Sequence, residues 1–315
     1  MSFKLRFWGV RGSYPATGKA FGTGGNTTCL EIEAGNATII IDAGTGIIRL
    51  GKEIMKRMAA QKKDSHQAFM FFTHYHQDHN QGLPFFVPLY NPRYKINFLG
   101  PTLGSRTMLE NLNINMYIPF FPVNFEETGC KKDFFNINEN QTVVISPDDP
   151  SSFQVCEKHL EIVKPPEPEK IKISINKNFI HPKDGCLYYT IEYKGKKVTF
   201  ATDVEGFVGG DQRLIAASKN ADYLIHDSQY LPEVYLNPFF PTQGFGHATP
   251  LIAADVARQA GVKTLVLTHH DPESDDQRVK KIQTLARKSF KNTIYAYEVM
   301  EIDVIENKIS PFTRF

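Results

Sequence analysis

The chain has 315 residues, of which 41% are hydrophobic and 22% are charged, as is usual for a globular protein of one large α/β domain or two small ones. A net charge of +2 argues against the strongly basic surface of a nucleic-acid-binding protein. No apolar run approaches the roughly 20 residues of a membrane span, and the first residues lack the apolar core of a signal peptide. The four cysteines have no CxxC spacing, so we expect reduced thiols and a cytoplasmic protein.

The first predicted elements flank a glycine-rich loop. Residues 3–10 alternate apolar and charged side chains, which predicts a half-buried strand. The loop over 9–25 has glycines that permit close backbone approach to a ligand, although an ordinary hairpin loop explains them equally well. Two further strands around Gly35-Asn36 predict a hairpin over residues 26–33 and 37–41.

A carboxylate ends the second strand of this hairpin. Asp42 follows the apolar run 39–41 and precedes two glycines, a position that often faces a functional crevice. The alternative is that Asp42 caps the following helix, whose apolar face is formed by Ile47, Leu50, Ile54 and Met58.

The most informative stretch is FMFFTHYHQDHNQG, residues 69–82. Its aromatic run 69–72 predicts a strand buried on both faces. Three histidines and one carboxylate follow within six positions, namely His74, His76, Asp78 and His79. Burying such groups without partners costs several kcal/mol, whereas a bound zinc, manganese or iron ion uses them as ligands. An exposed polar loop with chance histidines is the alternative.

The spacing suggests two metal sites. His74 and His76 are two residues apart at a strand end and can face the same way. Asp78 and His79 follow a turn and point elsewhere, so one segment can serve two adjacent metals.

The middle of the chain has few candidate catalytic or metal-binding residues. After a strand at 96–99 and a helix at 104–113, the segment 117–125 is aromatic and proline-rich, which fits a substrate lid, a partner surface or core filling. Several prolines over 148–170 predict a surface arm. We interpret about 101–175 as an insertion in a single domain over 1–315, because candidate site residues continue on both sides of it.

Polar residues again follow strands in the second half. His181 precedes an alternating strand, Asp203 follows the strand 197–201, and Asp227 follows the strand 223–225. His269 follows a buried strand at 264–267. Helices are predicted over 211–220 and 275–290, with a last strand over 294–304.

His247 lies just ahead of another predicted helix. Thr249 is a suitable N-cap, Pro250 a suitable first residue, and Gly261 follows the helix end. The free N–H groups and the dipole at such an N-terminus favour an anion.

The two halves of the chain resemble each other. A strand followed by Asp occurs at IIIDAG and TFATDV, and a strand followed by Thr-His occurs at FFTHYHQD and LVLTHHD. Two α/β halves that deliver polar residues to one shared edge would explain this pattern.

These motifs resemble those of a known family. THYHQDH, residues 73–79, is similar to the HxHxDH signature of the metallo-β-lactamase-fold superfamily, and His181, Asp203 and His269 follow in the order of its other ligand-bearing motifs. The resemblance covers nearly the whole chain except roughly 101–175. It implies an α/β fold built as a four-layer αββα sandwich.

Two shorter motifs resemble one branch of that superfamily. GHAT at Gly246 and HDSQ at His226 are similar to motifs of ribonuclease Z and of related phosphodiesterases, including those that cleave cyclic nucleotides and cyclic phosphates. The chain departs from ribonuclease Z because Asp227 stands where a glutamate is expected. It also lacks an obvious glycine-rich, basic arm for tRNA.

The resemblance implies a set of site residues. Two divalent ions, zinc with manganese or iron as alternatives, would be bridged by Asp203. His247 would stabilise the phosphoryl group or protonate the leaving oxygen, Asp227 would orient His247, and Asp42 would contact a ligand histidine. Asp78 counts as both ligand and catalytic group. The implied ligands are His74, His76 and His181 for one ion and Asp78, His79 and His269 for the other.

Other interpretations stay open for individual residues. His181 could be a surface residue, His270 competes with His269 for one ligand place, and Asp227 could only cap a turn. Arg11 could reach a substrate phosphate, although a solvated arginine is the simpler reading. Of the remaining histidines, we expect His226 to be packed at its strand end, and His66 and His159 to be exposed.

The favoured function is a binuclear phosphodiesterase for a small phosphodiester, in the first place a cyclic nucleotide. The alternatives are an RNA-processing nuclease, a lactonase or thioesterase on the same fold, and a non-catalytic ligand sensor. The weak net charge disfavours RNA, GHAT disfavours other esters, and the complete ligand set disfavours a sensor. The resemblance also suggests a homodimer without membrane contact, with lid or partner surfaces at Phe120–Pro122 and Phe239–Pro241.

Overall fold

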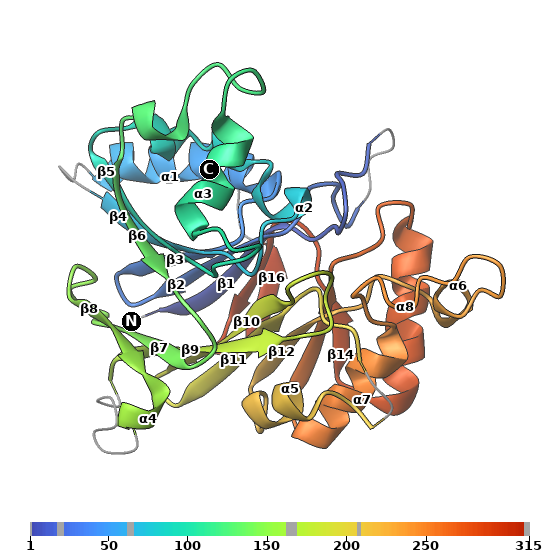
Figure 1. Cartoon of the computed structure of the whole chain (residues 1–315). Coiled ribbons are helices and arrows are strands. Elements are labelled where there is room, and N and C mark those ends of the chain that lie inside the picture. The colour runs from blue at the N-terminus through green and yellow to red at the C-terminus, as the bar shows by residue number, and fades with distance from the viewer. Residues whose placement is uncertain (1, 18–21, 62–65, 162–168, 207–208, 312–315) are drawn as a thin grey trace.

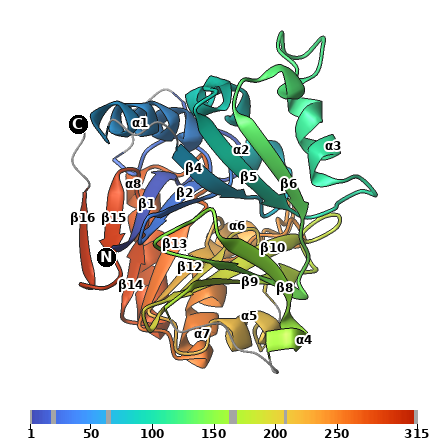
Figure 2. The ribbon, with the colours of Figure 1, turned by 90° about the vertical axis from the view of Figure 1, so that its left-hand side faces the viewer.

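The computed structural model describes residues 2–17, 22–61, 66–161, 169–206 and 209–311. Two β-sheets lie face to face, and helices cover both outer faces, as Figure 1 shows. In the turned view of Figure 2 the first sheet, with β4 to β6, lies above the second, with β7 to β12. The fold is the α/β, four-layer αββα sandwich that the sequence motifs predicted.

The first sheet has the strand order β16-β15-β1-β2-β3-β4-β5-β6 in the described residues. The strands from β3 to β6 run parallel, and the remaining pairs are antiparallel. The bounds are β1 (Phe3–Gly9), β2 (Cys29–Ala34), β3 (Ala37–Ile41), β4 (His66–Phe71), β5 (Tyr94–Gly100), β6 (Lys131–Asn136), β15 (Met300–Asp303) and β16 (Lys308–Pro311).

The second sheet has the order β14-β13-β12-β11-β10-β9-β7-β8. Its strands β11 to β14 run parallel, so both sheets contain a parallel half. The bounds are β7 (Gln141–Ile145), β8 (Phe153–Glu157), β9 (Ile171–Asn178), β10 (Cys186–Tyr193), β11 (Lys196–Ala201), β12 (Tyr223–Asp227), β13 (Thr264–Thr268) and β14 (Thr293–Tyr295).

The helices follow from amphipathic sequence and from capping. α7 begins after Thr249, whose hydroxyl accepts from the Ile252 amide at 3.3 Å, and ends at Gly261 in a left-handed conformation. α1 and α3 lie outside the first sheet, and α5, α7 and α8 lie outside the second (Figure 1). The helix bounds are α1 (Gly46–Gln61), α2 (Gln77–Asn80), α3 (Met108–Asn113), α4 (Lys158–Glu161), α5 (Gln212–Ala217), α6 (Pro232–Tyr235), α7 (Pro250–Ala260) and α8 (Asp276–Ser289).

Strand β4 shows how the layers are held. Phe69 and Phe71 pack into the core between the sheets, where Phe71 meets Tyr189 of the opposite sheet edge to face at 5.2 Å. Met70 and Phe72 face the other way, into the core beneath α1. Both faces of this strand are therefore buried, as its unbroken apolar run predicts.

One prediction about a strand is corrected by the structure, and the segment expected to be an insertion contributes strands to both sheets. The single strand expected over 294–304 is two strands in different sheets, because the chain crosses from β14 beside β13 to β15 beside β1. The segment 101–175 contributes β6 to the first sheet and β7 and β8 to the second. Of these strands, β6 and β8 are short, contain charged residues and lack the apolar runs that revealed the others.

The proline-rich part of this segment is a surface arm only in part. Residues 153–157 form the edge strand β8, and residues 162–168 lie outside the described part. The aromatic segment 117–125 is also divided, since Phe125 is buried in the core and Phe120 is 81% exposed. All four cysteines are free, and no helix among the described residues is long and apolar enough to cross a membrane.

Candidate metal centre

The predicted site residues meet at one edge of the sandwich. This edge holds the carboxyl ends of β3 and β4 from one sheet and of β11, β12 and β13 from the other. The start of β10 lies there as well, because β10 runs antiparallel to β11. His181, which lies five residues ahead of β10, and Asp203 and His269, which follow strands, therefore reach the cluster that follows β4.

The backbone is unusual where three of these strands end. Asp42, Asp203 and His269 have φ angles of 62°, 57° and 58°. This left-handed region costs an L-residue energy, and aspartate and histidine are among the residues that enter it most often. The side chains of all three residues lie in the cluster at this edge.

The first group of candidate ligands comprises three histidines. One ring nitrogen from each of His74, His76 and His181 lies within 4.8 Å of the others. His181 Nε2 stands 3.1 Å from His76 Nδ1. His74 and His181 are buried and His76 is exposed, so His76 marks the open side of the group.

The second group combines carboxylates and histidines. His79 Nε2 lies 3.2 Å from Asp78 Oδ2, and His269 Nε2 lies 3.2 Å from the same oxygen. The two histidine nitrogens are 3.3 Å apart. Ligand atoms at about 2.1 Å around one tetrahedral zinc ion stand about 3.4 Å apart, so this spacing suits a cation.

Asp203 lies between the two groups. Its Oδ2 is 3.1 Å from His79 Nε2 and 3.3 Å from His269 Nε2. Its Oδ1 is 3.8 Å from His74 Nε2 and 3.7 Å from His181 Nε2. One carboxylate oxygen therefore faces each group.

The chemistry of the cluster fits divalent metal ions. His74 Nε2 is buried and has no hydrogen-bond partner among the described residues, which is costly unless a ligand meets it. Burial lowers the pKa of His181 to about 4 and holds that of His74 well below its usual value. Both imidazoles are thus neutral at pH 7, the form that binds a metal.

The other ring nitrogen of each buried histidine bonds outside the cluster. His79 Nδ1 donates to Asp42 Oδ2 at 2.8 Å, and His74 Nδ1 to Thr73 Oγ1 at 3.0 Å. Such contacts leave Nε2 to face inward. Asp42 also accepts from Thr73, so it supports a candidate ligand histidine rather than capping α1.

His247 and Asp227 form a pair beside the cluster. His247 Nδ1 donates to Asp227 Oδ2 at 2.8 Å. Burial opposes the positive charge, but the carboxylates of Asp227, Asp203 and Asp78 raise the pKa of His247 to about 9. Asp227, His247 and His269 could also hold a cation by their spacing.

The structure decides several open interpretations. His181 and His269 are buried in the cluster. His270 lies outside it, and its Nε2 forms a hydrogen bond of 2.9 Å with the carbonyl oxygen of Ala296. His226 is packed at its strand end, with Nδ1 on the Asp227 carbonyl. His159 is exposed, as expected.

Two expectations about charged groups were wrong. His66 is half-buried rather than exposed. Arg11 neither reaches the site nor faces solvent, because its guanidinium is fully buried. That group donates to Gly24 O, Asp271 O, Ser274 O and Thr23 Oγ1.

Sequence reasoning missed three residues that contact the site. The Ser13 amide donates to Asp78 Oδ2 at 2.8 Å, and Gln229 Oε1 accepts from His269 Nδ1 at 2.9 Å. Glu205 binds the loop ahead of His247. A Cβ on Gly12 would stand 2.3 Å from His269 Nδ1. The glycine-rich loop therefore lies closer to His269 than a side chain at this position would permit. Two features of the sequence point to two of these residues: Ser13 lies in the glycine-rich loop, and Gln229 is the last residue of the HDSQ motif.

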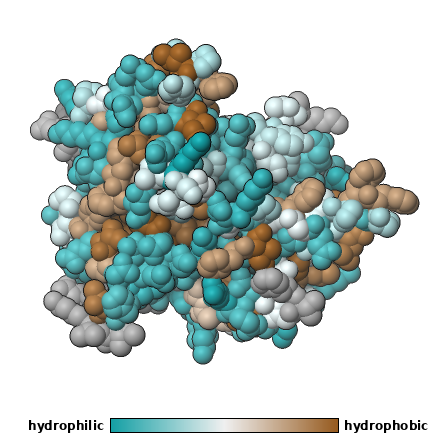
Figure 3. All heavy atoms as spheres, viewed as in Figure 1, coloured by the Kyte–Doolittle hydropathy of each residue, from teal (hydrophilic) through white to brown (hydrophobic). Residues whose placement is uncertain are grey.

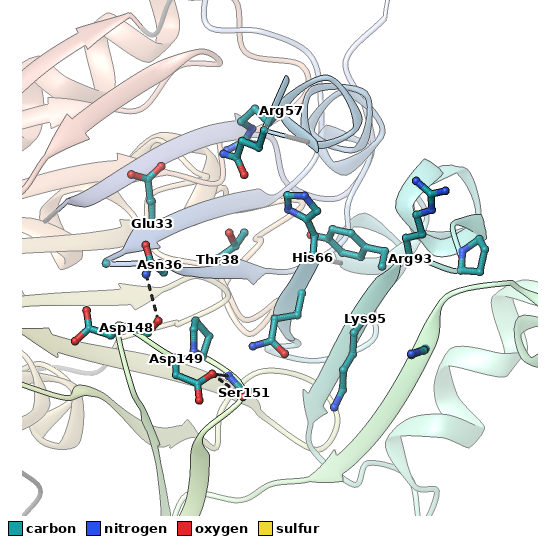
Figure 4. Close-up of a pocket in the computed structure, with 17 residues that line it drawn as sticks. Glu33, Asn36, Thr38, Arg57, His66, Arg93, Lys95, Asp148, Asp149 and Ser151 are labelled. Atoms are coloured by element: carbon teal, nitrogen blue, oxygen red, sulfur yellow. Dashed lines mark hydrogen bonds between the residues drawn. The ribbon is translucent and has the colours of Figure 1, made fainter. Parts of the chain in front are cut away.

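A large cavity lies at the opposite end of the parallel strands. It has a volume of about 870 Å³ and is lined by the amino ends of β4 and β5 and by the turn that contains Asp149. Figure 4 shows Arg57, Arg93 and Lys95 pointing in different directions around it. It contains none of the candidate ligands.

Comparison with known proteins places the chain in a family. Residues 37–270 match the model of the beta-lactamase superfamily domain. Proteins named ribonuclease Z match along nearly the whole chain: one from Thermoplasma volcanium is 29% identical, with 96% of this chain and 98% of the relative covered. One from Archaeoglobus fulgidus is 24% identical at the same coverage.

Solved structures support the same fold. The metallo-β-lactamase fold protein YhfI from Bacillus subtilis superposes with a TM-score of 0.62 at 18% identity, covering 95% of this chain and 98% of its own. The short form of human tRNase Z gives 0.58 at 18% identity, covering 96% and 99%.

The chain belongs to the beta-lactamase superfamily. Within it, the chain is a metal-dependent hydrolase that resembles the ribonuclease Z and phosphodiesterase branch.

Proposed function

We propose that this chain is a two-metal phosphodiesterase that cleaves a small nucleotide phosphodiester, in the first place a cyclic nucleotide. The observation that carries the proposal is the position of Asp203, with one oxygen toward each group of candidate ligands. Zinc is the expected metal, with manganese or iron as alternatives.

The two groups described above would hold one ion each. His74, His76 and His181 would bind the first, Asp78, His79 and His269 the second, and Asp203 both. Two divalent ions so placed would polarise the phosphoryl group and supply hydroxide at neutral pH.

His247 would act on the leaving group. Its Nδ1 is engaged by Asp227, which fixes the ring and leaves Nε2 for the substrate. With its raised pKa the imidazole carries a proton at pH 7. As the bond from phosphorus to the leaving oxygen breaks, the oxygen keeps the electron pair and takes this proton. General acid catalysis of this kind contributes about 10²–10⁴-fold.

The test is His247→Ala. We expect kcat for small phosphodiesters to fall by about 10²–10⁴-fold, with the metal content measured by mass spectrometry unchanged. His159→Ala, which alters an exposed histidine on α4, is the control and should keep full activity. Full activity in His247→Ala would refute the assigned role.

Ribonuclease activity is the second candidate, because relatives of that name match along almost the full chain. The net charge of +2 supports the small substrate, since binding of an RNA backbone needs many cations and weakens steeply with salt. Turnover of a panel of cyclic nucleotides, dinucleotides and a tRNA precursor at two salt concentrations separates the two. The cytoplasmic location and the homodimer remain predictions.

A further inference from the structure

Glu205 is a buried carboxylate to which the proposed mechanism gives no role. It lies two residues after Asp203, beyond the end of β11, and its side chain is only 3% exposed. We infer that Glu205 is a positioning residue for His247: it fixes the loop that brings His247 to the site. The inference rests on the role proposed above for His247.

Both oxygens of Glu205 accept hydrogen bonds from that loop. Oε1 accepts from the Gly244 amide at 2.8 Å, and Oε2 accepts from the Gly246 amide at 2.9 Å. The Tyr235 hydroxyl, at the end of α6, donates to Oε1 as well. One carboxylate therefore joins the beginning and the end of the loop over 236–246, and bonds to a charged acceptor are stronger than neutral ones.

Residues 236–245 of this loop are mostly exposed. It contains no helix or strand between α6 and α7, and Phe239 and Phe240 are each 83% exposed. Asn237 Oδ1 accepts from the amides of these two residues, which shapes only the tip. α6 and the loop project from the body in Figure 1, and Figure 3 shows apolar side chains on this projection. Burial of apolar surface therefore does not fix the loop.

Gly246 connects Glu205 to the candidate metal centre. Its amide donates to Glu205, while its carbonyl accepts from His181 Nδ1 at 3.3 Å. Its φ is +89°, and a Cβ there would stand 2.2 Å from His181 Nδ1. His247 is the next residue, so a shift of Gly246 moves the imidazole relative to the leaving oxygen. Misplacement of a catalytic group by about 1 Å can cost about 100-fold in rate.

The test is Glu205→Gln, which keeps the size of the side chain but replaces one acceptor oxygen with a donor. One glycine amide then loses its acceptor. We expect kcat to fall by at least tenfold, with KM changed less than threefold and with unchanged metal content. The fall should be larger for methyl phenyl phosphate than for methyl p-nitrophenyl phosphate, because the poorer leaving group depends more on a proton from His247.

A matched control lies one element away. Glu233→Gln makes the same change on α6, where Glu233 is exposed and pairs only with Lys281 among the described residues. Its kcat should stay within twofold of wild type. Amide hydrogen exchange at Gly244 and Gly246 should be faster in Glu205→Gln and unchanged in Glu233→Gln.

The outcomes separate this inference from the proposed function. An inactive His247→Ala with a fully active Glu205→Gln overturns the role of Glu205 alone, whereas a fully active His247→Ala overturns the mechanism. Equal losses on both leaving groups, or loss of metal, would show a merely structural role. If Glu205→Gln does not fold, Tyr235→Phe should show the same leaving-group preference and faster exchange, and absence of both contradicts the inference.

Discussion

The two ends of the parallel strands hold their charged groups differently. At the carboxyl ends, Asp42, Asp203 and Asp227 are almost fully buried and contact histidines. At the amino ends, the charged residues line an open cavity or form partly exposed pairs, such as Lys95 with Asp133 at 2.8 Å. Exposed pairs contribute little to stability.

Left-handed backbone occurs at both ends of the strands, for example at Lys194 and Asn220 ahead of β11 and β12. Among the described residues, only at the carboxyl ends does it coincide with a cluster of buried carboxylates and histidines. Left-handed backbone at a non-glycine residue costs about 1–3 kcal/mol, and three such residues end strands at the site. The buried carboxylates add a further cost unless they are paired. Cations bound at this end would offset both costs.

The largest effect on activity and metal content is expected for Asp203→Ala, at the carboxyl ends of the strands. We expect loss of all measurable activity and a fall from the two bound metals proposed above to one or none, because this carboxylate faces both groups of candidate ligands. Asp133→Ala at the amino ends should change neither. Metal analysis and turnover check both variants, and an Asp203→Ala protein that keeps two metals would contradict the bridging position.

Asp42→Asn should have a smaller effect. Asp42 bonds His79 Nδ1 rather than a metal, and loss of such a partner typically costs about 10–100-fold in metal affinity. Competition with a fluorescent zinc chelator measures this affinity. Asp149→Asn, in the cavity at the amino ends, is the matched control, and equal affinities for the two variants would count against the role of Asp42.

The pH dependence of kcat tests His247. Its pKa is raised, so the acid form persists above the ordinary histidine value and activity should fall as pH rises through about 9. Cations bound nearby would move this limb to lower pH. Rate measurements from pH 6 to 10 should show the limb in the wild type and not in His247→Ala. A limb that survives in the variant belongs to another group.

The smallest effect is expected at the amino ends. Asp222 accepts from Lys263 Nζ at 2.8 Å and from the Lys197 amide at 2.9 Å. Burial opposes the charge of Asp222, but these donors and Lys196 lower its pKa. A lowered carboxyl pKa stabilises the fold above the unfolded pKa, and this stability is lost as pH falls through the folded pKa.

Asp222→Asn should therefore lower the free energy of unfolding by about 1 kcal/mol at pH 7. The difference from wild type should shrink as the pH falls below 4, because Asp222 then takes up a proton. Urea denaturation at pH 7 and below pH 4 measures this difference in the free energy of unfolding. A difference that stays constant would mean that the charge of Asp222 is not responsible.

The candidate ligands could be predicted because each lies next to an apolar strand. Parallel strands bring their carboxyl ends to one edge, so His74, Asp203 and His269 could be placed together without a structure. The predicted order of helices and strands in both halves follows from the same pattern. Strands β6 and β8 are short and contain charged residues, so their sequences do not stand out. β7, QTVVI, has only five residues and does not alternate regularly.

The supporting residues could not be found in the same way. Glu205 accepts from the backbone amides of a distant loop, and Ser13 donates its own backbone amide to Asp78. No residue type marks such contacts. The burial of Arg11 also has no signal in the sequence, because its partners include three backbone carbonyls of residues far along the chain or in loops. Tertiary packing alone creates these contacts.

Anomalous diffraction at the zinc absorption edge, from crystals of the zinc-loaded protein, tests the central claim most directly. We predict two peaks about 3.5–4 Å apart, one beside His74, His76 and His181 and the other beside Asp78, His79 and His269, with Asp203 touching both. A single peak, or two peaks of which Asp203 touches only one, would contradict it.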